Sequence, residues 1–119
     1  MARVKGGVKA RRRHNRILAE TSGQFGARHK HIRKASEARL HALAYATRDR
    51  RTNRRELRSL WITRINAAAR REGMSYSQFM HGLQEAGVEV NRKVLADIAV
   101  NDPDGFRRFV ELAREAAAT

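Results

Sequence analysis

The sequence predicts an all-α protein in which an extended basic N-terminal arm and a long projecting helix lead into a small C-terminal helical domain. Three observations support this prediction. Residues 27–72 contain neither proline nor glycine and are rich in good helix formers. Apolar residues at helical spacing are concentrated in the second half of the chain. Residues 1–60 hold 18 Lys and Arg against 4 Asp and Glu, whereas residues 61–119 hold 8 of each.

The excess of basic residues ends near the point in the sequence where the regularly spaced apolar residues begin. We predict that residues 1–60 form the basic arm and long helix, with the helix continuing to about residue 72, and that residues 61–119 form the compact domain. The +14 balance of the first half implies a polyanionic partner, either phosphate or anionic lipid. Only 4 of its 18 basic residues are lysine, which favours planar, bidentate contacts with phosphates and bases.

The first element is a basic segment, residues 1–16, which carries too little apolar surface to offset chain entropy. Alone it is expected to be disordered or a marginal helix. It is either a solvated tail or, as we favour, a segment that orders against phosphates. Gly23 and Gly26 then predict a bend after any helix that reaches Glu20. Phe25, between them, suits either stacking on a nucleobase or packing on a neighbouring helix.

The next element is one helix from Ala27 to about Glu72, some 45 residues long and roughly 65 to 70 Å in length at 1.5 Å per residue. A domain of this size is narrower, so the helix must project. Repeated arginines interrupt any apolar heptad seam, which argues against a coiled coil. The small side chains of residues 35–46 suit close approach either by an RNA backbone or by the folded-back N-terminal segment.

The second half of this helix changes from basic to amphipathic. Six arginines between Arg48 and Arg58 are expected to spread around most of the helix and leave no apolar stripe. A stripe then begins, and we expect it to enter a core through Leu57, Leu60, Trp61, Ile65 and Ala68.

Turn chemistry predicts the remaining helices. Gly73 suits the C′ position of the long helix, and Ser75 with Gln78 forms a capping box with Met74 and Phe79 as a hydrophobic staple. A helix therefore starts at Tyr76 and stops near Gly87. Asn91 caps a third helix bearing Val94, Leu95 and Ile98, and Asp102–Pro103 opens a last one with Phe106, Phe109, Val110 and Ala113 inward. We expect Tyr76, Phe79, Phe106 and Phe109 to lie in the core rather than to stack on RNA.

Catalytic chemistry has little support in this sequence. The four acids of the basic half are dispersed, and no nucleotide-binding glycine motif occurs. His14, His29, His31 and His41 lack the carboxylates of a metal site, so phosphate neighbours are favoured over zinc. Cysteine is absent, which is compatible with the cytosol, and no apolar run has the length of a membrane helix. We expect no enzyme activity, no cofactor, no metal and no membrane partner.

A family resemblance rests on several stretches. Residues 1–5, Ser75–Ser77 and Leu95–Asp97 contribute to it. Its most specific part is a run in which basic residues precede Leu-Trp-Ile, Arg-Ile-Asn follows, and another basic residue comes last. The residues of this run are Arg54, Arg58, Leu60, Trp61, Ile62, Arg64, Ile65, Asn66 and Arg70. Over nearly its whole length the chain resembles the bacterial large-subunit ribosomal protein L20 family.

That resemblance implies a basic arm and long helix threaded into 23S ribosomal RNA, a small helical domain near the subunit's exterior, and a role early in assembly of the large subunit. Neighbouring large-subunit proteins are expected partners, and the location is the ribosome in the cytoplasm. In some bacteria such proteins also bind their own messenger RNA and repress its translation, which makes this messenger RNA a further expected partner.

Candidate RNA ligands are the basic residues of the arm, the long helix and the family pattern. Arg64 is as well suited to pairing within the chain, Asn66 suits a base edge or another helix equally, and Trp61 is favoured as a packing anchor over a stacking platform. The candidates are Arg3, Lys5, Lys9, Arg11, Arg12, Arg13, Arg16, Arg28, Lys30, Arg33, Lys34, Arg48, Arg50, Arg51, Arg54, Arg55, Arg58, Arg64 and Arg70.

Two other functions fit the charge. A nucleoid-type architectural protein would coat duplex DNA, but neither minor-groove wedges nor a dimer interface are evident in the sequence. A free translational repressor would bind messenger RNA outside the ribosome.

Overall fold

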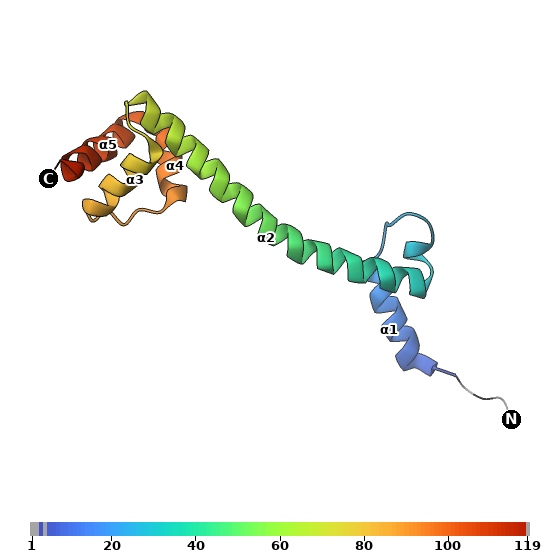
Figure 1. The fold of residues 1–119 in the computed structure, drawn as a ribbon. Coiled ribbons are helices and arrows are strands. Elements are labelled where there is room, and N and C mark those ends of the chain that lie inside the picture. The colour runs from blue at the N-terminus through green and yellow to red at the C-terminus, as the bar shows by residue number, and fades with distance from the viewer. Residues whose placement is uncertain (1–2, 4, 119) are drawn as a thin grey trace. The chain divides into compact units, whose positions relative to one another are not determined.

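The computed structural model describes residue 3 and residues 5–118. Within these residues the chain is helical and has no strand: α1 is Gly7–Glu20, the 3₁₀ helix η1 is Gly26–His29, α2 is Ile32–Arg71, α3 is Tyr76–Glu85, α4 is Arg92–Asn101 and α5 is Pro103–Ala117 (Figure 1). The predicted all-α class is confirmed. Backbone contacts divide the chain into an N-terminal unit, Met1–Arg51, and a C-terminal unit, Thr52–Thr119, and α2 contributes to both. The predicted domain boundary at residue 60 stays a prediction.

The N-terminal unit is held together by very few buried groups. α1 has no buried residue, but Thr21 at its end and Ala35 in α2 are both fully buried. The Thr21 hydroxyl lies 3.3 Å from the carbonyl oxygens of Ile17 and Leu18, so this buried polar group is hydrogen-bonded. Glu20 forms an ion pair with Arg39, which fastens the end of α1 to α2.

The long helix is shorter than predicted, because it begins at Ile32 instead of Ala27 and spans 40 residues instead of about 45. Gly26, with a φ of 66°, starts a 3₁₀ turn in which the Ala27 carbonyl accepts from the N–H groups of Lys30 and His31. His29 Nδ1 donates to the Gln24 carbonyl oxygen at 2.7 Å. These bonds stabilise a tight turn over residues that propensity alone would place in the helix.

The C-terminal unit has one hydrophobic core, to which α2, α3, α4 and α5 all contribute. The rings of Phe79 and Phe106 pack with centroids 5.1 Å apart. Trp61, Tyr76 and Phe109 are half-buried against the core, as expected of core residues. The fully buried members are Ile65, Ala69, Phe79, Leu83, Leu95, Ala96, Phe106, Val110 and Ala113.

Three predicted core residues are exposed in the structure. Leu57 and Leu60 on α2 and Val94 on α4 keep between 39% and 44% of their surface accessible. The inward face of α2 runs through Trp61, Ile65 and Ala69 at intervals of four, and Leu60 lies about 100° around the helix from Trp61. The small Ala69 side chain, which the prediction missed, lets the other helices approach α2 closely.

The predicted end of α2 and the predicted starts of α3, α4 and α5 are confirmed. Gly73 has a φ of 77°, its N–H bonds the Arg70 carbonyl, and the Met74 N–H bonds the Ala69 carbonyl, which is a Schellman motif. The Ser75–Gln78 capping box is present. Asn91 Oδ1 accepts from the Val94 N–H at 2.9 Å, and Asp102 caps α5 ahead of Pro103. These local bonds set where each helix starts and stops.

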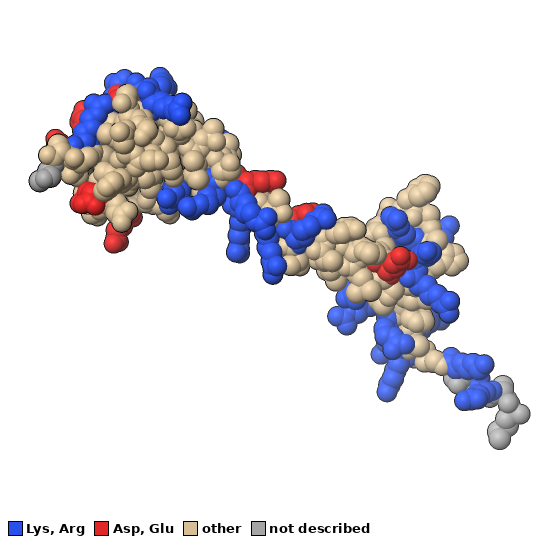
Figure 2. Space-filling model, viewed as in Figure 1, with Lys and Arg blue, Asp and Glu red and all other residues tan. Residues whose placement is uncertain are grey.

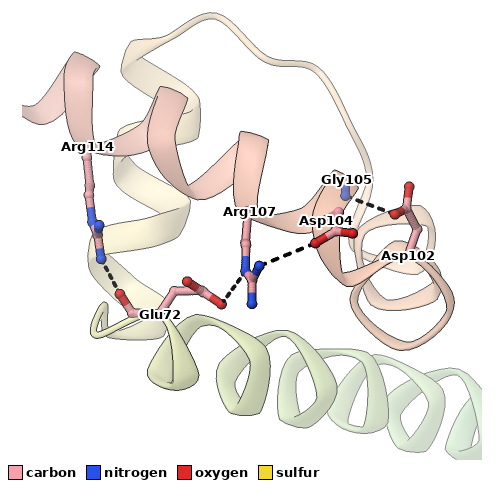
Figure 3. Close-up of polar contacts among 6 residues, drawn as sticks. All are labelled: Glu72, Asp102, Asp104, Gly105, Arg107 and Arg114. Carbon is pink, nitrogen blue, oxygen red and sulfur yellow. Dashed lines mark hydrogen bonds and ion pairs between the residues drawn. The ribbon is translucent and has the colours of Figure 1, made fainter.

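Polar contacts also join the end of α2 to α5, as Figure 3 shows. The Arg107 guanidinium donates to the Glu72 carboxylate at 3.1 Å and to the Asp104 carboxylate at 3.3 Å. Its hydrogen bond to Glu72, reinforced by the nearby negative charge, raises the pKa of Arg107. Arg114 donates to the carbonyl oxygen of Glu72, the residue that follows α2. The chain just after the end of α2 is therefore held by two arginines of α5.

Candidate nucleic-acid interface

The two units differ strongly in charge. The N-terminal unit holds 15 Lys and Arg against 3 Asp and Glu, a balance of +12, whereas the C-terminal unit holds 11 against 9. Figure 2 shows basic side chains gathered over α1 and along α2, and acidic side chains among the basic ones over the C-terminal helices. Self-repulsion at this density is relieved by a polyanion, so the basic unit is the natural place for a nucleic-acid contact.

All nineteen candidate RNA ligands lie at the surface. Arg3 and Lys5 precede α1, and Lys9, Arg11, Arg12, Arg13 and Arg16 lie on it, each exposed. Arg28 and Lys30 lie in or beside η1, and they too are exposed. The others, Arg33, Lys34, Arg48, Arg50, Arg51, Arg54, Arg55, Arg58, Arg64 and Arg70, are exposed along α2. Exposure permits phosphate contact, and the assignment of each ligand remains a prediction.

The arginines of α2 are more ordered around the helix than expected. Arg50, Arg54 and Arg58 are spaced by four residues and form one row, and Arg51 with Arg55 forms a second row beside it. The expectation that they spread around most of the helix is therefore wrong, because a spacing of three or four is the helical repeat. Adjacent rows present several guanidinium groups on one side of α2.

Some candidates have partners within the chain. Lys34 Nζ lies 3.6 Å from the Glu37 carboxylate. Arg48 Nε donates to Asp49 at 2.8 Å, and this bond raises the pKa of the guanidinium. Such exposed pairs contribute little and exchange readily for a phosphate. Arg39 is a basic residue of α2 that was not among the candidate RNA ligands, and it forms an ion pair with Glu20.

The structure also shows the surroundings of three residues of the family pattern, whose roles in RNA binding stay predictions. Asn66 Oδ1 accepts from Arg70 Nε at 3.2 Å, so the amide contacts its own helix. Among the described residues no carboxylate is paired with Arg64, whose side chain lines a shallow hollow with Trp61, Lys93 and Val94. Trp61 packs on the core with one part of its surface and lines this hollow with another.

The loop residue Phe25 is 95% exposed, which rules out its packing on a neighbouring helix of this chain. Sequence reasoning missed a second aromatic group. His41 and Tyr45 stack on α2 with ring centroids 5.9 Å apart, and they line a hollow of about 380 Å³ together with Arg28 and Lys34. Their spacing of four residues, followed by Arg48, was the available signal.

The described part of the chain contains no group of three or more His, Asp and Glu side chains placed to hold a metal ion. In residue 3 and residues 5–118 no helix combines the length and the apolarity needed to cross a membrane.

Comparisons with known proteins agree on one family. A family model described as Ribosomal protein L20 matches residues 3–109. The large ribosomal subunit protein bL20 of Pelobacter propionicus is 60% identical over 114 residues, which cover 96% of this chain and 97% of that protein. The bL20 proteins of Symbiobacterium thermophilum and Acetivibrio thermocellus are 58% and 55% identical, over 96% and 93% of this chain and 97% and 95% of their own lengths.

Proposed function

The chain belongs to the ribosomal protein L20 family, and from that premise we propose that it binds 23S ribosomal RNA directly and helps to organise it during early assembly of the large subunit. The family consists of structural, non-enzymatic ribosomal components, and the chain is one of them. Its cellular location is then the ribosome in the cytoplasm, where neighbouring large-subunit proteins are further partners.

The observation that carries this proposal is the exposed basic surface. The N-terminal unit has a balance of +12, and its buried residues within the described part are only Thr21 and Ala35. A segment with so small a core gains little from folding alone, and phosphates supply the missing stabilisation. Each phosphate that an arginine neutralises also releases condensed counterions, which favours binding.

The mechanism follows from the rows on α2. Guanidinium groups donate two parallel hydrogen bonds to phosphate oxygens, and adjacent rows on one helix can hold phosphates from separate RNA segments. Asp49 and Glu56, seven residues apart, share the side of α2 away from these rows and do not repel RNA bound there. The helix thereby acts as a cationic strut that lowers the repulsion between RNA strands.

The test compares two pairs of arginines that carry the same charge. Arg54→Ala with Arg55→Ala removes candidate ligands, whereas Arg71→Ala with Arg108→Ala removes exposed arginines outside the candidate set. Affinity for a 23S ribosomal RNA transcript is measured over a series of salt concentrations. We expect the first pair to reduce the slope of log affinity against log salt by about 2 and the second to leave it nearly unchanged.

An equal effect of the two pairs would show that the arginine rows on α2 have no special part in RNA binding and would leave only general charge attraction. A competition between duplex DNA and the ribosomal RNA transcript at one salt concentration tests the architectural DNA-binding alternative. If the chain is an RNA-binding protein, an equimolar amount of duplex DNA does not displace it from the RNA. Co-sedimentation of the chain with large ribosomal subunits completes the test.

The protein's own messenger RNA is a second proposed partner, favoured by the shallow hollow in the C-terminal unit. There the half-buried Trp61 ring lines the hollow together with the cations Arg64 and Lys93 and one carboxylate, Asp97. The two cations outnumber the carboxylate, and cationic and aromatic side chains together suit RNA. If this surface binds the messenger, replacing Arg64 and Lys93 by alanine weakens binding to the leader transcript. Equal binding by the double variant would contradict the proposal.

A further inference from the structure

We propose that the hollow lined by η1 and the first half of α2 is a binding site for a single unstacked RNA nucleotide. Its base lies against the His41–Tyr45 pair and its phosphate lies beside Arg28. The inference rests on the proposed function and deepens it, because it adds a site that reads an unpaired base to a surface otherwise described by phosphate contacts.

The hollow has the size and the walls of a ligand site. Its volume is about 380 Å³, within the range of pockets that hold small molecules. One wall comes from Gln24 and Arg28, and the other comes from α2. Ala38 and Ala42 contribute only methyl groups to the α2 wall, so a planar group can approach the helix closely. All these residues belong to the N-terminal unit.

The aromatic wall is part of a ladder along α2. The rings of His41 and Tyr45 are inclined by 29°, and the Arg48 guanidinium lies 4.7 Å from the centre of the Tyr45 ring. Tyr45 remains 50% exposed in a region of high positive charge and belongs to no hydrophobic core. Because the Arg48 guanidinium already lies over the Tyr45 ring, the side on which a nucleobase can extend the ladder is the hollow, which both His41 and Tyr45 line.

Charge within the hollow orients the nucleotide. Arg28 and Lys34 attract a phosphate, whereas the Glu37 carboxylate repels one. Lys34 is partly neutralised by Glu37, 3.6 Å away, so Arg28 is the stronger phosphate ligand. The Glu37 carboxylate accepts hydrogen bonds only, so it suits the N–H groups on the edge of a base. The nucleotide is therefore expected to bind with its base toward α2 and its phosphate toward η1.

The wall formed by η1 is fastened by contacts within the chain. The His29 imidazole donates to the Gln24 carbonyl oxygen, and Glu20 is paired with Arg39 across the start of the loop. The buried Thr21 side chain fixes the same segment from inside. Contacts of this kind reduce the conformational entropy that the wall loses on binding, so one nucleotide can contribute measurably to affinity.

The experiment uses the full chain and two RNA hairpins that differ only by one bulged, unpaired nucleotide. We expect the wild-type chain to bind the bulged hairpin about tenfold more tightly, the effect of one base stacking on an aromatic group. Tyr45→Ala should abolish this preference without changing affinity for the fully paired hairpin or its salt dependence. Tyr45→Phe, which keeps the ring, should retain the preference. Leu43→Ala, at an exposed position of the same helix, is the matched control.

Equal affinity of the wild-type chain for the two hairpins would overturn the inference. So would an equal loss of affinity for both hairpins in Tyr45→Ala, because that result places Tyr45 in general RNA attraction or in folding. Circular dichroism of each variant identifies a folding defect, and His41→Ala then replaces Tyr45→Ala in the comparison. If the wild-type chain binds both hairpins equally with a normal salt slope, only this site fails. If it binds no ribosomal RNA, the proposed function fails.

Discussion

The contact between α3 and α5 gives the sharpest stability prediction, the effect of Gly82→Ala. Gly82 is buried in α3 against Ala113 of α5. A Cβ atom at residue 82 would lie 2.3 Å from the Ala113 carbonyl oxygen and 2.8 Å from its carbonyl carbon and Cβ. Two of these atoms belong to the backbone and cannot rotate away. The two helices would have to move apart.

Two opposing effects determine the magnitude. Alanine is favoured over glycine inside a helix by about 1 kcal/mol. Overpacking a close contact costs about 1 to 3 kcal/mol, and the upper part of that range applies here because the rigid backbone is involved. Moving α3 from α5 would also loosen Phe79 and Phe106, which pack next to the crossing. We therefore expect Gly82→Ala to lower the free energy of unfolding by about 1 to 2 kcal/mol.

Thermal and urea unfolding of the full chain, followed by circular dichroism at fixed salt, measures this change. For a domain of this size the melting temperature should fall by about 5 to 15 °C. Ser77→Ala, on an exposed position of the same helix, is the control for helix propensity and should not be destabilising. A Gly82→Ala variant as stable as the wild type would refute the close crossing of α3 and α5.

Two further predictions concern stability. Trp61→Ala should lower the free energy of unfolding by about 2 to 3 kcal/mol, less than for a fully buried tryptophan because the ring is only half-buried. Unchanged melting would place Trp61 on the RNA surface alone. Ser75→Ala removes the α3 N-cap and should lower the same quantity in urea titrations by about 1 kcal/mol. Full stability in that variant would show that the capping box is dispensable.

Helix ends were predictable because their interactions span only a few residues. The bonds of Ser75 with Gln78, of Asn91 with Val94 and of Asp102 with Gly105 each join positions three apart. The core face of α2 was less predictable. Leu60 and Ala69 lie on different sides of the helix, and the identity of the helices that cover α2 decides which side is buried. Hydrophobicity favoured the leucine, whereas close packing required the alanine.

The candidate interface shows the same division between local and long-range information. Exposure of the arginines follows from composition and charge, so their surface position was predictable. The hollow beside His41 depends on the loop lying against α2, which requires Glu20 to meet Arg39, 19 residues away. A contact of that kind leaves no periodic signal in the sequence. Only the ladder of His41, Tyr45 and Arg48 was visible as helical spacing.

The arginine rows and the core face of the C-terminal unit are consecutive parts of one side of α2. Arg54 precedes Trp61 by seven residues and Arg58 precedes Ile65 by seven, which is nearly two full turns. Packing of Ile65 and Ala69 in the core therefore fixes the direction in which Arg54 and Arg58 point. A core substitution that turns this part of α2 would rotate the guanidinium groups with it. If α2 binds RNA as proposed, RNA affinity and the stability of the C-terminal unit are coupled through the helix itself.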